Sequence, residues 1–565
     1  MNISEKIVET KICKQCNSSF DITDKDLEFY DKVSPIFNDI KYNIPTPQQC
    51  PECRERRRLG FRNERIMYRR NSDFSGKEII SMYSPDKSYK VYTHDEWFSD
   101  KWDAMDYGVN FDFSKSFFEQ INKLIFEVPL LGLTNSESEN SSFNNYIIGV
   151  KNCYMSSVVY LDSEDVYYSS WVYTGKDIID CRSIFDSQVC YESHDCRYCS
   201  NCFYVSHSFN SYNCFFSRNL TGCKNCIFCT NLENKEYYIF NKKVSKDEFE
   251  IQKNQILTGS YENINNALIE FNKFSISQPF VYANLINCEN STGDNLFNAK
   301  NAFMCFDLVD IEDSKFCNAG NTKDSYDGIG GENERCYEFS RVGWAQNVLF
   351  TYDGVECNNV ILSFGVYNSS NLFGCVGLRN KKYCIFNKQY TKEEYEVLVP
   401  KIIEHMQKTN EWGEFFPLNV SPFGYNESVA QEYYPLTKER ALISGCNWSD
   451  YKAPFPKVKK IIPANKLPDN IKDIPDDILN RAVECEITKK PFRIIKEELD
   501  FYRKHNLPIP RKHPNQRHLD RMNKRNPRKL YKRNCYGCND EINTNYSPER
   551  PEKVYCERCY MGKVY

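Results

Sequence analysis

The sequence lacks the features that usually identify an enzyme, a membrane protein or a secreted protein. Its 7 histidines are scattered along 565 residues, and none lies in an HExxH or triad-like setting. It has no GxxxxGK[ST] phosphate-binding loop. No apolar run approaches the length of about 18 residues that indicates a membrane span, and the first residues contain no apolar signal-peptide core. These absences favour a cytoplasmic protein without catalytic activity.

The chain also has no overall excess of basic residues. It contains 73 Lys and Arg against 77 Asp and Glu, for a formal net charge of -4. This balance argues against a wholly basic nucleic-acid-binding protein. Residues 485–534 are an exception, with 16 Lys and Arg against 5 Asp and Glu. A local basic region indicates a polyanionic partner better than the net charge does.

Cysteine, by contrast, is abundant, with 27 residues. In a reducing compartment, cysteines act as metal ligands or as small buried apolar residues rather than as a disulfide framework. Paired CxxC motifs form one set near each end of the chain. The sets are Cys13, Cys16, Cys50 and Cys53, and Cys535, Cys538, Cys556 and Cys559.

The two ends of the chain resemble each other. Residues 50–97 align without a gap on residues 513–560, and residues 20–32 resemble residues 492–504. Each copy has positions for two four-residue sites and keeps the cysteines of a different one. The positions equivalent to the first set are Cys485, Thr488, His513 and Gln516, and those equivalent to the second are Ser72, Ser75, Thr93 and Glu96. Cysteines that come and go in sets of four are expected if each set binds one ion.

Two CxxC pairs supply four thiolates, which match a closed tetrahedral zinc site with no open position for catalysis. The alternative is a cluster of reduced, buried cysteines. Pro51 suits the first turn of a helix, and a helix N-terminus favours the thiolate form of Cys50 and Cys53. A knuckle followed by a cysteine pair at a helix start is typical of treble-clef-like folds. We therefore predict two structural Zn²⁺ ions.

These motifs resemble known families. "CKQCNSSFDITDKDLEFY…CPECR" resembles the small bacterial "probable zinc-ribbon" family, and "CYGCNDEINTNYSPERPEKVYCERCY" resembles the CxxC–CxxC ribbon that commonly follows it. The whole chain resembles uncharacterised cysteine-rich zinc-ribbon proteins of small-genome candidate-phyla bacteria. The resemblance implies zinc and a cytoplasmic location, and it implies no activity. The incomplete first site of the second copy departs from the pattern.

Basic residues recur at matching positions after the cysteines of both copies. At helical spacing those of the first copy fall on one stripe. Such a stripe suits phosphate contact, because guanidinium groups bind phosphate bidentately. The alternatives are a solvated helix paired with acidic side chains, or an acidic protein partner. The predicted nucleic-acid contacts are Arg54, Arg58, Arg62, Arg65 and Arg69, with Arg517, Arg521, Arg525, Arg528 and Lys532.

Short apolar motifs recur every 12 residues in the middle of the chain, from "VYYSS" at 166 to "YIFNK" at 238 and from "CYEFS" at 336 to "CIFNK" at 384. A short fixed period of β-branched, aromatic and Cys residues broken by Asn, Asp and Ser is typical of a β-solenoid. A meander of antiparallel hairpins is the alternative. Ser245 with Glu248, and Thr391 with Glu394, fit capping boxes, so we expect a helix to cover the end of each array.

We therefore predict a mainly β, multidomain protein. Two tandem 12-residue-repeat β-solenoid-like arrays with helical caps are flanked by duplicated zinc-ribbon or treble-clef-like modules. The predicted parts are 1–100 (N-terminal zinc-ribbon module), 101–140 (connector with a helix), 141–278 (first array and capping helix), 279–408 (second array and capping helix), 409–484 (Pro-rich surface connector) and 485–565 (C-terminal zinc-ribbon module).

Cysteines and aromatic residues occupy fixed positions within the arrays. Cys199, Cys202, Cys223 and Cys226 would converge on one ion if a coil contained two repeats; the alternative is a ladder of small thiols. Alternation along a strand would place the aromatic positions, such as Tyr191 and Phe203, opposite the cysteines. We expect them to be covered as a second core face rather than exposed as a stacking platform for bases or sugars.

The sequence supports three hypotheses of function. The first is a non-enzymatic zinc protein that binds RNA or DNA through the basic helices. The second is a protein-interaction scaffold whose zinc ribbons are purely structural. The third is a β-helical carbohydrate-acting or redox enzyme, in which Asp307, Asp310 and Asp313 would supply paired carboxylates. The partner and the oligomeric state are not predicted.

Overall fold

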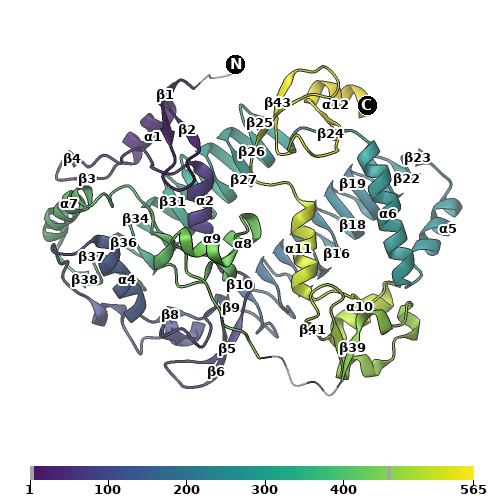
Figure 1. Cartoon of the computed structure of the whole chain (residues 1–565), viewed down its shortest axis with the longest axis horizontal. Helices are drawn as coiled ribbons and strands as arrows, with labels where there is room; N and C mark the ends of the chain where they lie inside the picture. The colour runs from purple at the N-terminus through teal and green to yellow at the C-terminus, as the bar shows by residue number, and fades with distance from the viewer. Residues whose placement is uncertain (1–4, 455–457, 459, 565) are drawn as a thin grey trace.

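The computed structural model describes residues 5–454, 458 and 460–564. Two large sheets, of 15 and 14 strands, dominate it, and smaller modules lie at both ends of the chain (Figure 1). The predicted mainly β class is therefore confirmed. Among the described residues, none of the helices has the length and apolar character that a membrane crossing requires.

The first sheet is almost entirely parallel. Its strands are β9 (Asn135–Ser136), β10 (Asn145–Ile148), β11 (Ser157–Tyr160), β12 (Glu164–Tyr167), β13 (Ser170–Tyr173), β14 (Lys176–Ile179), β15 (Arg182–Phe185), β16 (Gln188–Tyr191), β17 (His194–Arg197), β18 (Ser200–Phe209), β19 (Tyr212–Thr221), β20 (Lys224–Ile227), β21 (Thr230–Glu233), β22 (Glu236–Ile239) and β23 (Lys242–Lys243).

The second sheet is built in the same way, and six of its strands, β27–β29–β31–β32–β30–β28, close into a parallel ring. Its strands are β25 (Leu285–Glu289), β26 (Gly293–Phe303), β27 (Cys305–Lys315), β28 (Asn318–Lys323), β29 (Tyr326–Ile329), β30 (Asn333–Glu334), β31 (Tyr337–Gly343), β32 (Ala345–Leu349), β33 (Tyr352–Val355), β34 (Asn358–Ile361), β35 (Phe364–Tyr367), β36 (Ser370–Phe373), β37 (Lys382–Ile385) and β38 (Lys388–Gln389).

Helices and two- or three-stranded sheets make up the rest. The helices are α1 (Asp24–Val33), α2 (Pro51–Leu59), α3 (His94–Trp97), α4 (Phe117–Glu127), α5 (Lys246–Ile256), α6 (Tyr261–Ser277), α7 (Lys392–Lys408), α8 (Ala430–Tyr433), α9 (Lys438–Ile443), α10 (Lys496–Lys504), α11 (Pro514–Lys524) and α12 (Glu557–Val564). The small strands are β1 (Ile7–Ile12), β2 (Ser19–Thr23), β3 (Ile36–Phe37), β4 (Ile40–Lys41), β5 (Tyr68–Asn71), β6 (Glu78–Ser81), β7 (Val91–Tyr92), β8 (Leu130–Leu131), β24 (Phe280–Val281), β39 (Ile461–Pro463), β40 (Ala482–Glu484), β41 (Pro491–Phe492), β42 (Tyr531–Asn534), β43 (Glu541–Thr544) and β44 (Val554–Tyr555).

The strands of the first sheet form two interleaved parallel ladders. One ladder joins β12, β14 and β16, and the other joins β13, β15 and β17. Glu164 pairs with Lys176, and Lys176 pairs with Gln188, so the partners are 12 residues apart. The long strands β18 and β19 belong to both ladders. Parallel pairing rules out the alternative of antiparallel hairpins.

A left-handed residue recurs at every third position along these strands. The φ angles of Asp165, Tyr168 and Trp171 are 55°, 53° and 59°. Asn and Asp tolerate this conformation better than other residues with a side chain, which explains why they are frequent at these positions. Their side chains also stack between neighbouring strands, as when the Asn201 amide donates to Asn213 at 2.8 Å.

The inward-facing side chains of the sheets also recur every third residue. Val166, Ser169 and Val172 are all buried. The expected alternation of side chains is therefore wrong, because the left-handed residues turn the chain after every three positions. The Ser169 hydroxyl donates to the Tyr167 carbonyl at 2.9 Å, and Cys181 on the next coil likewise donates to a carbonyl two residues before it. Cys and Ser suit this narrow core because they are small and can satisfy backbone carbonyls.

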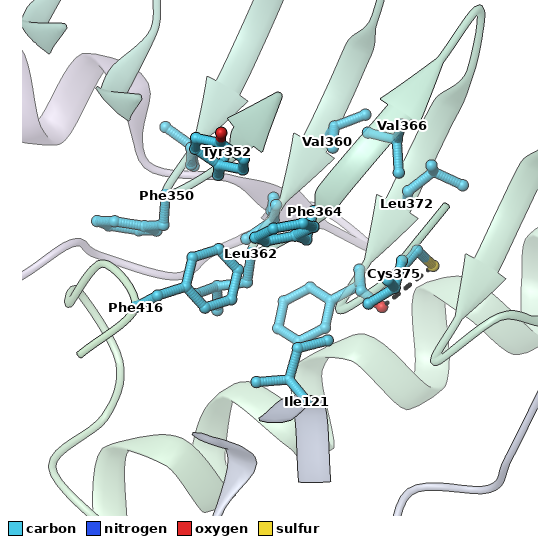
Figure 2. Packing of buried hydrophobic residues seen from close by; sticks show 14 of the residues in the cluster. Ile121, Phe350, Tyr352, Val360, Leu362, Phe364, Val366, Leu372, Cys375 and Phe416 are labelled. Atoms are coloured by element: carbon cyan, nitrogen blue, oxygen red, sulfur yellow. Dashed lines mark hydrogen bonds between the residues drawn. The ribbon is translucent and has the colours of Figure 1, made fainter. Parts of the chain in front are cut away.

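A helix begins at each of the two predicted capping boxes. α5 follows Ser245 and α7 follows Thr391, each with a complete capping box. The aromatic positions of the first sheet pack into a core shared with α5, α6 and α10, so the prediction that they are covered is confirmed. On the second sheet, α4 contributes Ile121 to the core, on the same side of the strands as Phe364 and Phe416 (Figure 2).

The Pro-rich segment 409–484 is not the surface connector that we expected. Trp412, Phe415, Phe416 and Tyr425 are buried, and the first three of these belong to the core of the second sheet. The aromatic residues between the prolines supply the apolar area that draws this segment into the interior.

Each terminal module contacts both sheets. In the N-terminal module, Phe29 of α1 stacks on Tyr326 of the second sheet, and β7 pairs with β8, the strand that leads into the first sheet. In the C-terminal module, Tyr502 of α10 packs on Tyr191 of the first sheet, and β44 pairs with β24, the strand that leads into the second. Figure 1 shows α2 beside β31 and α11 beside β16 and β18. Each duplicated module therefore packs on one sheet and pairs with the strand that leads into the other, so both modules connect the two sheets.

Candidate metal centres

The four cysteines of the N-terminal set lie together. All four sulfur atoms are within 4.8 Å of one another, and the Cys16 and Cys50 sulfurs are 3.7 Å apart. A tetrahedral ion with bonds of about 2.3 Å to sulfur needs an S–S separation of about 3.8 Å. The donor set therefore fits a metal ion, and its geometry is consistent with zinc.

Local backbone structure positions these ligands. After Cys13 the chain turns tightly, with Asn17 in the left-handed conformation at a φ of 61° and its amide donating to the Cys13 carbonyl at 2.9 Å. Cys50 is the N-cap of α2, and Pro51 occupies the first turn. A hydrogen bond from the Cys53 thiol lowers the pKa of Cys50 to about 5. The same hydrogen bond raises the pKa of Cys53, so a bound cation is needed to hold both sulfurs as thiolates.

The C-terminal set is equally compact but closer to solvent. Its four sulfurs also lie within 4.8 Å of one another, and those of Cys538 and Cys556 are 3.8 Å apart. The backbone amides of Gly537 and Cys556 donate to the Cys535 sulfur at 3.3 and 3.2 Å. Gly537 is required by close packing, since a Cβ atom there would lie 2.9 Å from the Cβ of Cys559.

The two positions that lack a full cysteine set are filled in other ways. At the second site of the N-terminal copy, the Glu96 carboxylate accepts from the Ser72 hydroxyl at 2.5 Å and from the Thr93 amide at 3.0 Å. A hydrogen-bonded carboxylate thus occupies the place of a metal ion. At the first site of the C-terminal copy, His513 Nδ1 accepts from a backbone amide as a helix cap. Neither set belongs to the metal-ligating groups found among the described residues.

The arginines of α2 point into the second sheet. Arg54 donates to Asp327 at 2.7 and 3.0 Å, and Arg58 donates to the other oxygen of Asp327 at 3.2 Å. The side chains of Arg58 and Asp327 are both 0% exposed. Arg57 pairs with Glu338 of the same sheet at 2.9 Å. The helix is therefore attached to the sheet by buried ion pairs.

The arginines of α11 bind the first sheet in the same way. Arg517 and Arg521 both pair with Asp180, the latter at 2.9 Å. Beyond the end of the helix, Arg525 pairs with Asp195 and Asp307, which belong to different sheets. Arg528 pairs with Asp307 and with Glu55 of the N-terminal copy, so the two copies also contact each other.

The other members of the predicted stripe do not continue it. α2 ends at Leu59, so a single helical stripe through Arg69 is wrong. Arg62 is buried against Glu64, and Arg65 reaches Asn515 at 3.4 Å. Of the ten predicted contacts, Arg69 and Lys532 are the two with mostly exposed side chains, at 62% and 75%. Nucleic-acid contact by these ten residues stays a prediction, and the low exposure of the other eight does not favour it.

Glu498 lies beneath the α11 arginines and carries a pH-sensitive charge. It accepts from Tyr168 and Tyr502 at 3.0 and 3.1 Å. Burial raises the pKa of its carboxyl to about 7, against the opposing effect of the Arg517 guanidinium. The folded state therefore binds this proton more tightly than the unfolded state does. The protonated Glu498 carboxyl therefore contributes to the free energy of unfolding. This contribution is complete below the unfolded pKa of about 4.3 and is lost as the pH rises through 7.

We expect Glu498→Gln to remove this pH dependence. Between pH 5 and pH 8, the opening free energy of α10 should fall by about 2 kcal/mol more in the wild type than in the variant. Amide hydrogen exchange of α10 at the two pH values measures the difference. Glu497→Gln, an exposed neighbour on the same helix, should behave like the wild type. Equal pH slopes in the wild type and Glu498→Gln would contradict the assignment.

The cysteines of the first sheet are held by its backbone. Each of four thiols lies within hydrogen-bonding distance of two backbone carbonyls, to either of which it can donate: Cys199, Cys202, Cys223 and Cys226. Cys190 pairs with Cys202, and Cys214 with Cys226, so one coil contains one repeat interval and not two. Among the described residues, these four do not form a metal-ligating group. A metal ion there stays a prediction.

The carboxylates of the third hypothesis are on β27, at three successive left-handed positions. Asp310 and Asp313 accept from Asn298 and Asn301 on the neighbouring strand at 2.8 and 2.7 Å. Asp307 is instead engaged by Arg525 and Arg528. The sequence did not single out another group that the structure brings together, His194, Asp195 and His207. The 12-residue interval between Asp195 and His207 was the signal that could have revealed it.

Comparison of the chain with protein-family models and with curated proteins gives no match. The two four-cysteine clusters therefore indicate metal binding from their geometry alone.

Proposed function

We propose that this protein is a zinc-stabilised, non-enzymatic interaction scaffold. Its two sheets are two tandem solenoids of 12-residue coils, and the terminal four-cysteine modules are structural zinc sites that hold the solenoids together. The observation that carries the proposal is the burial of the α2 and α11 arginines against carboxylates of the sheets. These arginines form ion pairs inside the protein and are not available to phosphate groups, which supports a scaffold over a nucleic-acid-binding protein.

Each four-cysteine cluster lies next to an element through which its module contacts a sheet, so an ion there would stabilise that contact. Cys50 and Cys53 flank the start of α2, whose arginines bind Asp327. Cys556 immediately follows β44, the strand that pairs with β24. Because a structural zinc ion contributes its binding energy to folding, loss of either ion would release one contact between a module and a sheet. The extended coil surfaces are the part of a solenoid that partners use.

Nucleic-acid binding by the full chain tests the proposal. We expect no saturable binding of single- or double-stranded RNA or DNA at low salt, measured by fluorescence anisotropy. The ultraviolet absorbance spectrum of the purified protein should show no bound nucleic acid. Saturable, salt-sensitive binding that is lost when the exposed Arg69 and Lys532 are changed to Glu would overturn the scaffold and favour the nucleic-acid hypothesis.

A further inference from the structure

A second kind of ligand cluster lies on the outside of the first sheet. His194 and Asp195 are on β17, and His207 is on β18. These strands are paired so that His194 faces Ser206, which sets Asp195 beside His207. Asp195 and His207 both occupy left-handed positions, with φ angles of 54° and 48°. One ligand atom from each of the three residues lies within 4.8 Å of the others.

His207 lacks the hydrogen bond that a buried imidazole nitrogen usually makes. His207 Nδ1 is buried and has no hydrogen-bond partner among the described residues. It lies 3.9 Å from a carboxylate oxygen of Asp195, too far for a hydrogen bond. The two imidazole rings meet edge to face with centroids 5.5 Å apart. An unpaired buried nitrogen is costly, and an ion placed between the three ligands would satisfy it.

Charged side chains from both sheets and from the C-terminal module surround the cluster. A small cavity beside the cluster is lined by three carboxylates, Asp195, Asp294 and Asp307, and by two guanidinium groups, Arg525 and Arg528. The adjoining cavity adds the guanidinium groups of Arg182 and Arg197, so carboxylates and guanidinium groups nearly balance around the cluster. Arg525 also donates to both oxygens of Asp195 at 3.1 and 3.2 Å. Such hydrogen bonds commonly orient the carboxylate ligand of a metal ion.

We propose that His194, Asp195 and His207 bind a third metal ion, a divalent transition metal held by two imidazole nitrogens and one carboxylate oxygen. This donor set suits Zn²⁺, Fe²⁺ or Co²⁺ rather than Mg²⁺ or Ca²⁺, which prefer oxygen ligands. Unlike the two four-cysteine clusters, it leaves coordination positions free. The adjoining cavity of about 100 Å³ is lined by groups including Trp171, Arg182 and Asn295, so a small anion or water would complete the coordination.

Cobalt distinguishes this site from the cysteine sites. When Co²⁺ is added to the full chain loaded with only two equivalents of zinc, which the thiolates of the cysteine clusters bind first, we expect one further equivalent to bind with a d–d absorption and no thiolate charge-transfer band. His207→Gln should weaken this binding at least 10-fold and leave two zinc ions per chain. His94→Gln is a matched control, because the His94 side chain is 26% exposed and that of His207 22%. The control should bind Co²⁺ like the wild type.

The proposal is overturned if the wild type binds no third equivalent, or if His207→Gln binds Co²⁺ as well as the wild type does. A measurement without a variant covers the case in which His207→Gln fails to fold. Co²⁺ should protect His207 of the wild type from diethyl pyrocarbonate, with the modified residues located by mass spectrometry. Equal modification with and without Co²⁺ would also overturn the proposal. Neither result depends on whether the protein is a scaffold.

Discussion

Cys53→Ser should remove one metal ion per chain and detach α2 from the second sheet. A serine hydroxyl does not replace a thiolate as a ligand, and a structural zinc ion supplies on the order of 10 kcal/mol of folding free energy to a small module. We expect amide exchange of α2 to accelerate at least about 100-fold, which corresponds to about 3 kcal/mol of opening free energy. Elemental analysis and hydrogen exchange on the same sample measure both effects.

The second copy of the module provides the matched control. Cys485 occupies the position equivalent to Cys13 and is fully buried, but its copy lacks the other three thiols of that site. Cys485→Ser should leave the metal content unchanged and α2 protected. If Cys53→Ser kept both ions, or lost one while α2 stayed protected, the N-terminal cluster would not be what holds α2 in place.

Asp327→Asn should destabilise the same contact without touching the cysteines. Asp327 neutralises Arg54 and Arg58, and none of the three side chains is more than 2% exposed. Removing one partner of a buried ion pair leaves an uncompensated charge and costs about 3–5 kcal/mol. Hydrogen exchange of α2 and β29 should report a loss of this size, with the ions of both four-cysteine clusters still bound.

An exposed ion pair in the same module sets the scale for comparison. Arg69 and Glu78 are 2.7 Å apart, but their side chains are 62% and 63% exposed. Glu78→Gln should therefore cost less than about 1 kcal/mol. Arg58→Met, combined with Asp327→Asn, should recover part of the stability, because Glu338 then has one buried cation fewer to compensate. If Asp327→Asn cost no more than Glu78→Gln, the buried arginines would not be what attaches α2.

The duplication of the terminal modules could be read from the sequence and is visible in the backbone. β5 pairs with β6 and β42 pairs with β43 in the same register, with Tyr68 opposite Ser81 and Tyr531 opposite Thr544. The cysteine clusters were predictable for the same reason. Each CxxC pair is a short local motif, so its spacing already limits what the four sulfurs can do together.

The behaviour of the repeats was only partly predictable. The 12-residue spacing of the motifs matches the spacing of paired strand residues, such as Glu164 and Lys176. The aromatic side chains lie opposite the cysteines as predicted, since Tyr191 and Cys190 belong to separate core clusters. The predicted period of two was wrong, because alternation holds only for regularly extended strands. Asp177, Asp180 and Asp186 lie on the three-residue pattern of left-handed positions. Their spacing was a usable sign of this geometry.

The sequence by itself determined the ligand sets at the two ends, the capping helices and the positions of the arginines. Only the tertiary structure decided what the arginines bind. Arg54 and Asp327 are 273 residues apart, and Arg521 and Asp180 are 341 residues apart. A basic stripe has the same appearance in sequence whether it meets phosphate, water or a carboxylate. The partner depends on how the two sheets and the two modules pack, and no local pattern specifies a contact over such separations.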